Sequence, residues 1–117
     1  MIVYIDDIRD PARFLPGVEV VWIKEFWEAR NFIFDHNTEI TEIHFDNQLD
    51  DPNYTGMDIF TMVAFDCMWG DKNQDWPVLS KIYLHTSDRD VILDAIEKYG
   101  DKLKAAGVEL INNSLGW

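Results

Sequence analysis

Short apolar runs alternate with segments of helical periodicity along most of this chain. Runs rich in β-branched and aliphatic residues predict five β-strands, at residues 2–5, 18–23, 40–45, 79–84 and 108–111. Three helices are predicted between them, over residues 24–34, over residues 56–69 and from a capped start at Ser87-Asp88-Arg89-Asp90 to a stop at Gly107. Because residues 56–69 are apolar on almost every side, we expect that helix to pack in the interior.

This alternation of strands and helices predicts a parallel β-sheet with helices on both faces. Five strands in 117 residues fit a flavodoxin-like α/β fold, a three-layer sandwich with strand order 2-1-3-4-5. The sequence contains no internal repeat and no linker, so we expect one domain over residues 1–117. Ligands of such sheets bind beyond the carboxyl ends of the strands, where strands 1 and 3 diverge.

Three carboxylates follow two of the predicted strands, since Asp6 and Asp7 end the first strand and Asp46 ends the third. If they meet at one edge of the sheet, they need a counter-charge to stay ionised. Oxygen ligands of this kind suit a hard cation, Mg²⁺ or Mn²⁺. The alternative interpretation of each motif is turn chemistry at the end of a strand.

A second group of polar residues predicts phosphate chemistry at the same edge. Thr86 and Ser87 lead into a helix N-terminus, where free N–H groups favour a phosphate, although Ser87 could simply cap the helix. Arg9 could hold an anion through two hydrogen bonds. His85 could act as a general acid that protonates the leaving oxygen of a phosphoester. We expect nearby carboxylates to raise the pKa of His85 in the metal-free protein.

His44 shares the strand face of Asp46 and is expected to have a structural role. The lone cysteine, Cys67, lies in an apolar run and is expected to be a buried thiol. A single cysteine excludes an intramolecular disulfide and a cysteine-based zinc site.

The charge distribution limits which classes of partner we expect the protein to bind. Against 22 acidic residues stand 10 basic ones, which gives a formal net charge of −12. This excess argues against general nucleic-acid binding and against docking on an anionic membrane. Acidic residues dominate from Asp35 to Asp75, a tract typical of a metal-binding rim or of a surface that attracts basic proteins. The N-terminal residues do not resemble a signal peptide, so we expect a cytoplasmic protein.

Three motifs together resemble a known family. They are VYIDDIRDP at residues 3–11, FDNQL at 45–49 with Thr55-Gly56-Met57-Asp58 behind it, and YLHTSD at 83–88. They resemble the cyclic-phosphate-processing receiver-like domains, small relatives of two-component receiver domains that are common in phages and bacterial conflict loci. The resemblance spans nearly the whole chain and implies processing of cyclic or terminal phosphates of nucleotides.

The resemblance also implies roles for individual residues. Asp6, Asp7 and Asp46 correspond to the acidic pocket, and His85 to a family histidine. The chain departs from the family at Asn47, which replaces a strand-3 histidine, and at Gln48, which replaces a second aspartate. Asn112-Asn113 follow the fifth strand where receiver domains carry a lysine, so ordinary phospho-aspartyl signalling is not expected.

Two hypotheses follow from these observations. The first is a metal-dependent phosphoesterase, or a catalytically degenerate relative of one, with a phosphate-bearing nucleotide as its ligand. In it, His85 and Asp46 are catalytic, and the phosphate contacts are Arg9, Asn47, Thr86 and Ser87. The second is a non-enzymatic acidic protein, such as a phage-type inhibitor that binds a basic host surface or mimics nucleic acid. The retained carboxylates and His85 favour the first, whereas the net charge and the missing strand-3 histidine favour the second.

Overall fold

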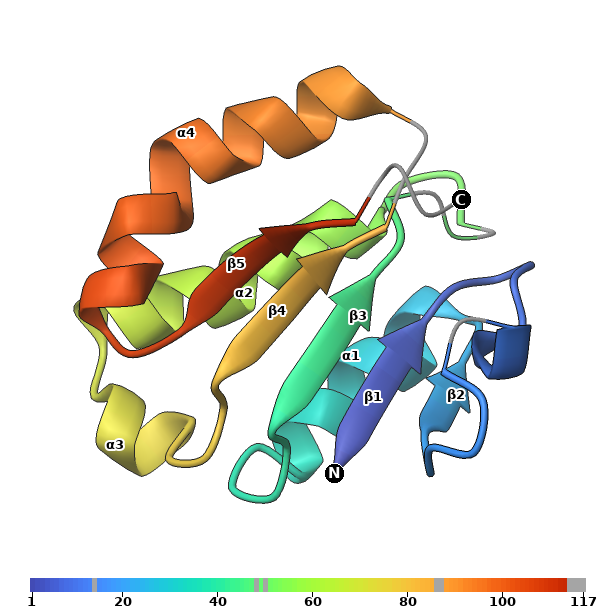
Figure 1. Cartoon of the computed structure of the whole chain (residues 1–117), viewed down its shortest axis with the longest axis horizontal. Coiled ribbons are helices and arrows are strands. Elements are labelled where there is room, and N and C mark those ends of the chain that lie inside the picture. The colour runs from blue at the N-terminus through green and yellow to red at the C-terminus, as the bar shows by residue number, and fades with distance from the viewer. Residues whose placement is uncertain (14, 48, 50, 86–87, 114–117) are drawn as a thin grey trace.

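The computed structural model describes residues 1–13, 15–47, 49, 51–85 and 88–113. Its elements in chain order are β1 (Ile2–Ile5), the 3₁₀ turn η1 (Pro11–Arg13), β2 (Val21–Ile23), α1 (Phe26–Asp35), β3 (Glu42–Phe45), α2 (Gly56–Trp69), α3 (Lys72–Asp75), β4 (Lys81–Leu84), α4 (Arg89–Ala105) and β5 (Glu109–Asn112) (Figure 1). All the predicted strands and helices are present. Several strands begin later than predicted, and the short elements η1 and α3 were not predicted.

The strands form one parallel sheet in the order β2-β1-β3-β4-β5, which confirms the predicted fold class and strand order. One side of each central strand faces the core, through Val3 and Ile5, Ile43 and Phe45, and Ile82 and Leu84. These side chains alternate with residues that face the other way, because successive side chains of a strand point to opposite faces.

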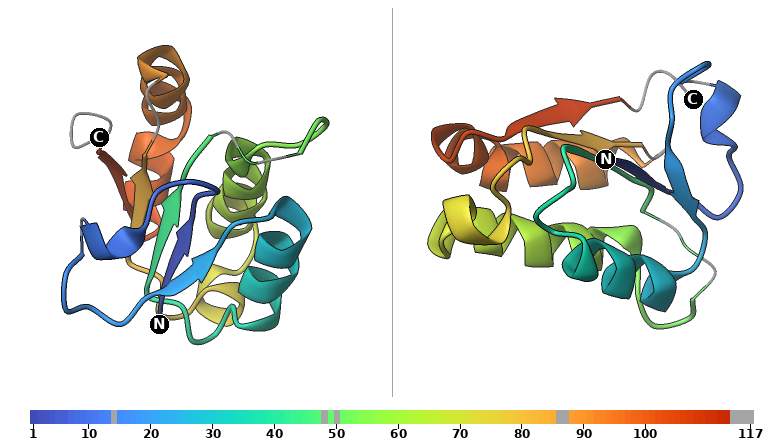
Figure 2. Two further views of the ribbon diagram at one scale, coloured as in Figure 1. Left: turned by 90° about the vertical axis from the view of Figure 1, so that its right-hand side faces the viewer. Right: turned by 90° about the horizontal axis from the view of Figure 1, so that it is seen from below.

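The longer helices all lie on one face of this sheet. Figure 2 shows α1, α2 and α4 on one side and η1 on the other. The reason is the right-handedness of β–α–β crossovers, since the connections from β2 to β3, β3 to β4 and β4 to β5 all advance in one direction across the sheet. The connection from β1 to β2 runs in the opposite direction, and its only described helical element is η1. The predicted second helical layer is therefore replaced, in the described part of the chain, by η1 and its loops.

Helix α2 matches its predicted bounds but is not interior on every side. Ile59, Phe60 and Val63 are fully buried, whereas Met62, Phe65 and Trp69 are 38%, 42% and 67% exposed. The prediction of an interior helix is wrong on this side because, among the described residues, no further layer covers the outer surface of α2.

The start of α4 differs from the sequence prediction by one residue. Asp88, not Ser87, is the N-cap residue, and its carboxylate accepts a hydrogen bond from the Val91 N–H at 3.3 Å. Gly107 follows the helix with a φ of +90°, as expected for a helix stop. Cys67 is buried, as predicted. No described helix is both long and apolar enough to cross a membrane.

Candidate functional site

Two cross-strand rows of side chains lie on the face of the sheet opposite α1, α2 and α4, which we call the helix-free face because η1 is its only described helical element (Figure 2). Pairing across the five strands aligns the first row, Trp22, Tyr4, His44, Tyr83 and Ile111. Two residues further along each strand lies the second row, Lys24, Asp6, Asp46, His85 and Asn113. The backbone N–H groups of four of these residues continue the ladder, donating to carbonyl groups of the neighbouring strands at 2.8–3.1 Å. The strand register therefore brings Asp6, Asp46 and His85 to one edge on one face, as the sequence predicts.

The acidic cluster consists of Asp6, Asp7 and Asp46. One carboxylate oxygen from each of the three lies within 4.8 Å of the others. Asp6 and Asp46 are buried, with 1% and 7% exposure, and Asp7 is half-buried. The predicted convergence of the three carboxylates is confirmed.

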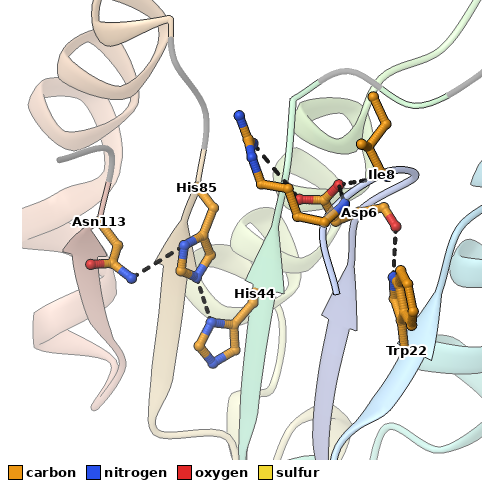
Figure 3. A network of polar contacts seen from close by, with 7 residues as sticks. Asp6, Ile8, Trp22, His44, His85 and Asn113 are labelled. Atoms are coloured by element: carbon orange, nitrogen blue, oxygen red, sulfur yellow. Dashed lines mark hydrogen bonds and ion pairs between the residues drawn. The ribbon is translucent and has the colours of Figure 1, made fainter. Parts of the chain in front are cut away.

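Asp6 is held by its own turn, and its second carboxylate oxygen forms an ion pair with Arg9 but accepts no hydrogen bond (Figure 3). Its Oδ1 accepts hydrogen bonds from the backbone N–H groups of Ile8 and Arg9, both at 2.9 Å, and its carbonyl accepts one from Trp22 Nε1 at 2.8 Å. Its Oδ2 is buried without a hydrogen-bond partner, and Arg9 Nη1 lies 3.8 Å away. A buried carboxylate oxygen of this kind is costly unless a cation or a donor meets it. The donor set therefore fits a hard divalent cation.

The pKa of Asp46 reflects its burial and the charges around it. Burial and, after it, the charge of Asp6 raise the pKa of Asp46 from 3.8 to about 7. Arg9 and the Asn47 N–H act in the opposite sense but do not cancel the shift. Near neutral pH, Asp46 is thus close to its own midpoint, and a bound cation would favour its ionised form.

The structure pairs His85 with a second histidine. His85 Nε2 lies 2.5 Å from His44 Nδ1, and His85 Nδ1 lies 3.2 Å from Asn113 Nδ2 (Figure 3). Both imidazoles are buried, and the His44 ring stacks on Tyr83 at 4.2 Å between centroids. The sequence analysis missed this pair, although each histidine occupies the helix-free face of its strand.

The predicted rise in the pKa of His85 is wrong. Burial, together with smaller contributions from repulsion by His44 and Arg9, lowers the pKa of His85 to about 3, while burial lowers the pKa of His44 to about 4. The cost of desolvating a charged imidazole dominates, as expected for buried groups of this type. Both rings are neutral at physiological pH, so in the free protein His85 is a proton acceptor and not a general acid.

The remaining predicted site residues are Arg9, Asn47, Thr86 and Ser87, and the structure describes only the first two. Arg9 lies beside Asp6, as described above. Asn47 is half-buried next to Asp46, and its carbonyl accepts a hydrogen bond from the Gly56 N–H at 2.8 Å. Thr86, Ser87 and Gln48 lie outside the described residues. A shallow cavity of about 450 Å³, lined by Asp7, Ile8, Lys24 and Glu25, opens beside the acidic cluster.

The sheet order and the acidic cluster together define a receiver-like α/β domain. A family model described as the cyclic-phosphate processing receiver domain matches residues 1–98, and the chain belongs to that family. The matched region includes the acidic cluster and both paired histidines, and it ends within α4, before β5 and Asn113. No curated protein and no solved structure matches the chain.

Proposed function

We propose that this domain hydrolyses a cyclic or terminal phosphate of a nucleotide, with the help of Mg²⁺ or Mn²⁺. The observation that carries this proposal is the second cross-strand row, in which Asp6, Asp46 and His85 stand together at the carboxyl edge of the sheet. Membership of the cyclic-phosphate-processing family supports the same substrate class.

The acidic cluster would hold the metal through Asp6, Asp7 and Asp46. Asp6 Oδ2, buried without a hydrogen bond, and the raised pKa of Asp46, about 7, both describe a site whose negative charge Arg9 only partly offsets. When bound, a divalent cation polarises phosphoryl oxygens and offsets the negative charge that develops in the reaction. Arg9 would offer a second positive charge to the phosphate, and we retain Asn47, Thr86 and Ser87 as further proposed phosphate contacts.

His85 would act as the general base, because its imidazole is neutral. One nitrogen takes a proton from a water molecule, the water oxygen forms a bond to phosphorus, and one ester P–O bond breaks. The proton on the imidazolium then passes to the leaving oxygen, which restores the neutral ring and yields a phosphomonoester from a cyclic phosphate. General base catalysis of this kind contributes about 10²–10⁴ in rate.

The test is hydrolysis of nucleoside cyclic phosphates, followed by phosphorus NMR, with Mn²⁺ or with a chelator. We expect turnover only with the metal, and a loss of at least ~10²-fold in Asp6→Asn or His85→Ala. Asp101→Asn, at an exposed position of α4, is the matched control and should behave as the wild type.

Thermal unfolding tests the metal site independently of turnover. Ligand binding to the folded state should raise the melting temperature of the wild type and of Asp101→Asn but not of Asp6→Asn. Equal metal-induced shifts in all three proteins, or turnover in the presence of the chelator, would refute the metal-dependent proposal.

The outer surface of α2 favours a second candidate function, binding of a basic protein without catalysis. Met62, Phe65 and Trp69 are exposed there, and α2 carries two aspartates and no Lys or Arg. Large exposed apolar groups on a helix without basic residues suit a basic amphipathic segment, which would displace Lys102, whose Nζ lies 5.3 Å from the centroid of the Trp69 ring. A Lys/Leu helical peptide should bind the wild type at low salt, more weakly above ~0.3 M, and more weakly to Trp69→Ser. Binding that is unchanged by Trp69→Ser would exclude this surface.

A further inference from the structure

We infer that His44 and Asn113 are positioning residues that together fix the tautomer of His85, with the proton on Nε2 and the lone pair on Nδ1. It follows that Nδ1 of His85 is the nitrogen that meets the substrate. The catalytic meaning of this inference rests on the proposed function, whereas the direction of the hydrogen bond rests on contacts within the protein.

The contact with Asn113 determines the direction at one end of the pair. Asn113 Nδ2 lies 3.2 Å from His85 Nδ1, and an amide nitrogen can only donate. His85 Nδ1 is therefore an acceptor, and in a neutral imidazole the proton must then be on Nε2. His85 Nε2 consequently donates to His44 Nδ1, which lies 2.5 Å away.

Glu42 gives an independent argument at the other end. If His44 Nδ1 accepts, the proton of His44 is on Nε2, and this nitrogen lies 3.9 Å from Glu42 Oε2. The positive end of an N–H dipole then faces a carboxylate. In the opposite arrangement a lone pair would face that carboxylate, which is unfavourable. Because His44 Nε2 is buried and has no hydrogen-bond partner, the attraction to Glu42 acts on it at low dielectric.

The His44 ring is well supported for such a role. It stacks on Tyr83 with an angle of 3° between the planes, and the Tyr4 ring lies 5.6 Å away. His44 belongs to the first cross-strand row, two residues before the second row that contains Asp6, Asp46 and His85. It therefore acts through His85 and not on the substrate. Side chains fixed on strands hold a reacting group more accurately than side chains on loops.

The Asn113 contact marks the lone pair of His85 to which a nucleophilic water would donate. The amide group of Asn113 donates to the Nδ1 lone pair in the free protein, and a nucleophilic water would donate to the same lone pair during hydrolysis. Substrate binding would therefore displace Asn113 from His85. Once Nδ1 has taken the proton, the imidazolium can still donate from Nε2 to His44.

Nitrogen NMR of the imidazole rings tests the tautomer directly, without any turnover. The chain has three histidines, and His36, half-exposed beside Glu39, gives a reference signal outside the pair. We expect a pyridine-type shift at Nδ1 and a pyrrole-type shift at Nε2 for His85 in the wild type. In His44→Phe combined with Asn113→Leu, which removes both the acceptor at Nε2 and the donor at Nδ1, His85 should populate both tautomers. In His44→Asn, whose amide oxygen can replace Nδ1, the tautomer should be retained, and His36→Asn should leave it unchanged.

Kinetics then connects the tautomer to the reaction. His44→Phe should lower kcat by roughly 10–100-fold with little change in KM, because removal of a group that orients a histidine has effects of this size. His44→Asn should recover most of kcat. A pyrrole-type Nδ1 on His85 in the wild type, or an unchanged His85 tautomer in the His44→Phe, Asn113→Leu double variant, would overturn the inference.

The two proposals fail in different ways. If the wild type hydrolyses no nucleotide but the tautomers are as expected, the proposed function fails and the positioning by His44 stands. If His44→Phe does not fold, the wild-type spectrum and His44→Asn still decide the direction of the hydrogen bond.

Discussion

Asp46 should make the stability of the metal-free protein fall as the pH rises. Its pKa is about 7 in the folded protein against 3.8 as the ordinary value, so the folded state favours the protonated carboxyl. The stabilising contribution is therefore complete below about pH 4 and is lost as the pH rises through about 7. Replacement of Asp46 by Asn removes the ionisable group and keeps nearly the same shape.

The magnitude follows from the pKa shift. A shift from 3.8 to about 7 corresponds to roughly 4 kcal/mol in the free energy of unfolding. Because structural relaxation and water penetration lower the cost of burying a charge, we expect about 2–3 kcal/mol in practice. Asp46→Asn should thus be more stable than the wild type by this amount at about pH 8, and the difference should shrink by about 1 kcal/mol on going to about pH 5.

Urea unfolding in the presence of a chelator measures this difference. Stability of the wild type, Asp46→Asn and the control Asp101→Asn would be compared at each pH, with equal slopes against urea as the condition for a valid comparison. Asp101→Asn should follow the wild type. If the curves of wild type and Asp46→Asn run parallel from about pH 5 to about pH 8, Asp46 does not titrate as we describe, and the charge argument for the cluster fails.

Two further predictions concern the frame around the site. Gly56→Ala should destabilise the protein by roughly 1–3 kcal/mol or more, because a Cβ at Gly56 would lie 1.7 Å from the Asp46 carbonyl oxygen. This loss is expected although Ala is the better helix former. Thermal unfolding measures it, and a stabilised variant would contradict the close contact. Asp88→Ala should cost about 0.5–2 kcal/mol through loss of the α4 N-cap, whereas Asp88→Asn should recover most of it; equal losses in both variants would show that charge and not capping is responsible.

Much of the fold could be predicted from the sequence because its signals are local. Alternating apolar runs identify strands, and Gly107 marks the end of α4, as the structure confirms. The acidic cluster was equally accessible, since Asp6, Asp7 and Asp46 directly follow strands whose carboxyl ends meet at one edge in any parallel sheet of this order.

The tertiary structure decided which groups face one another and in what environment. The pairing of His44 with His85 depends on strand register, which no local pattern specifies. The sign of the His85 pKa shift depends on burial, and burial depends on how the chain covers the helix-free face of the sheet. The exposed side of α2 has the same origin, because an all-round apolar helix is interior only if a further layer packs against it. The sequence by itself determined which chemical groups reach the edge of the sheet, and only the packing of the layers determined their protonation and their partners.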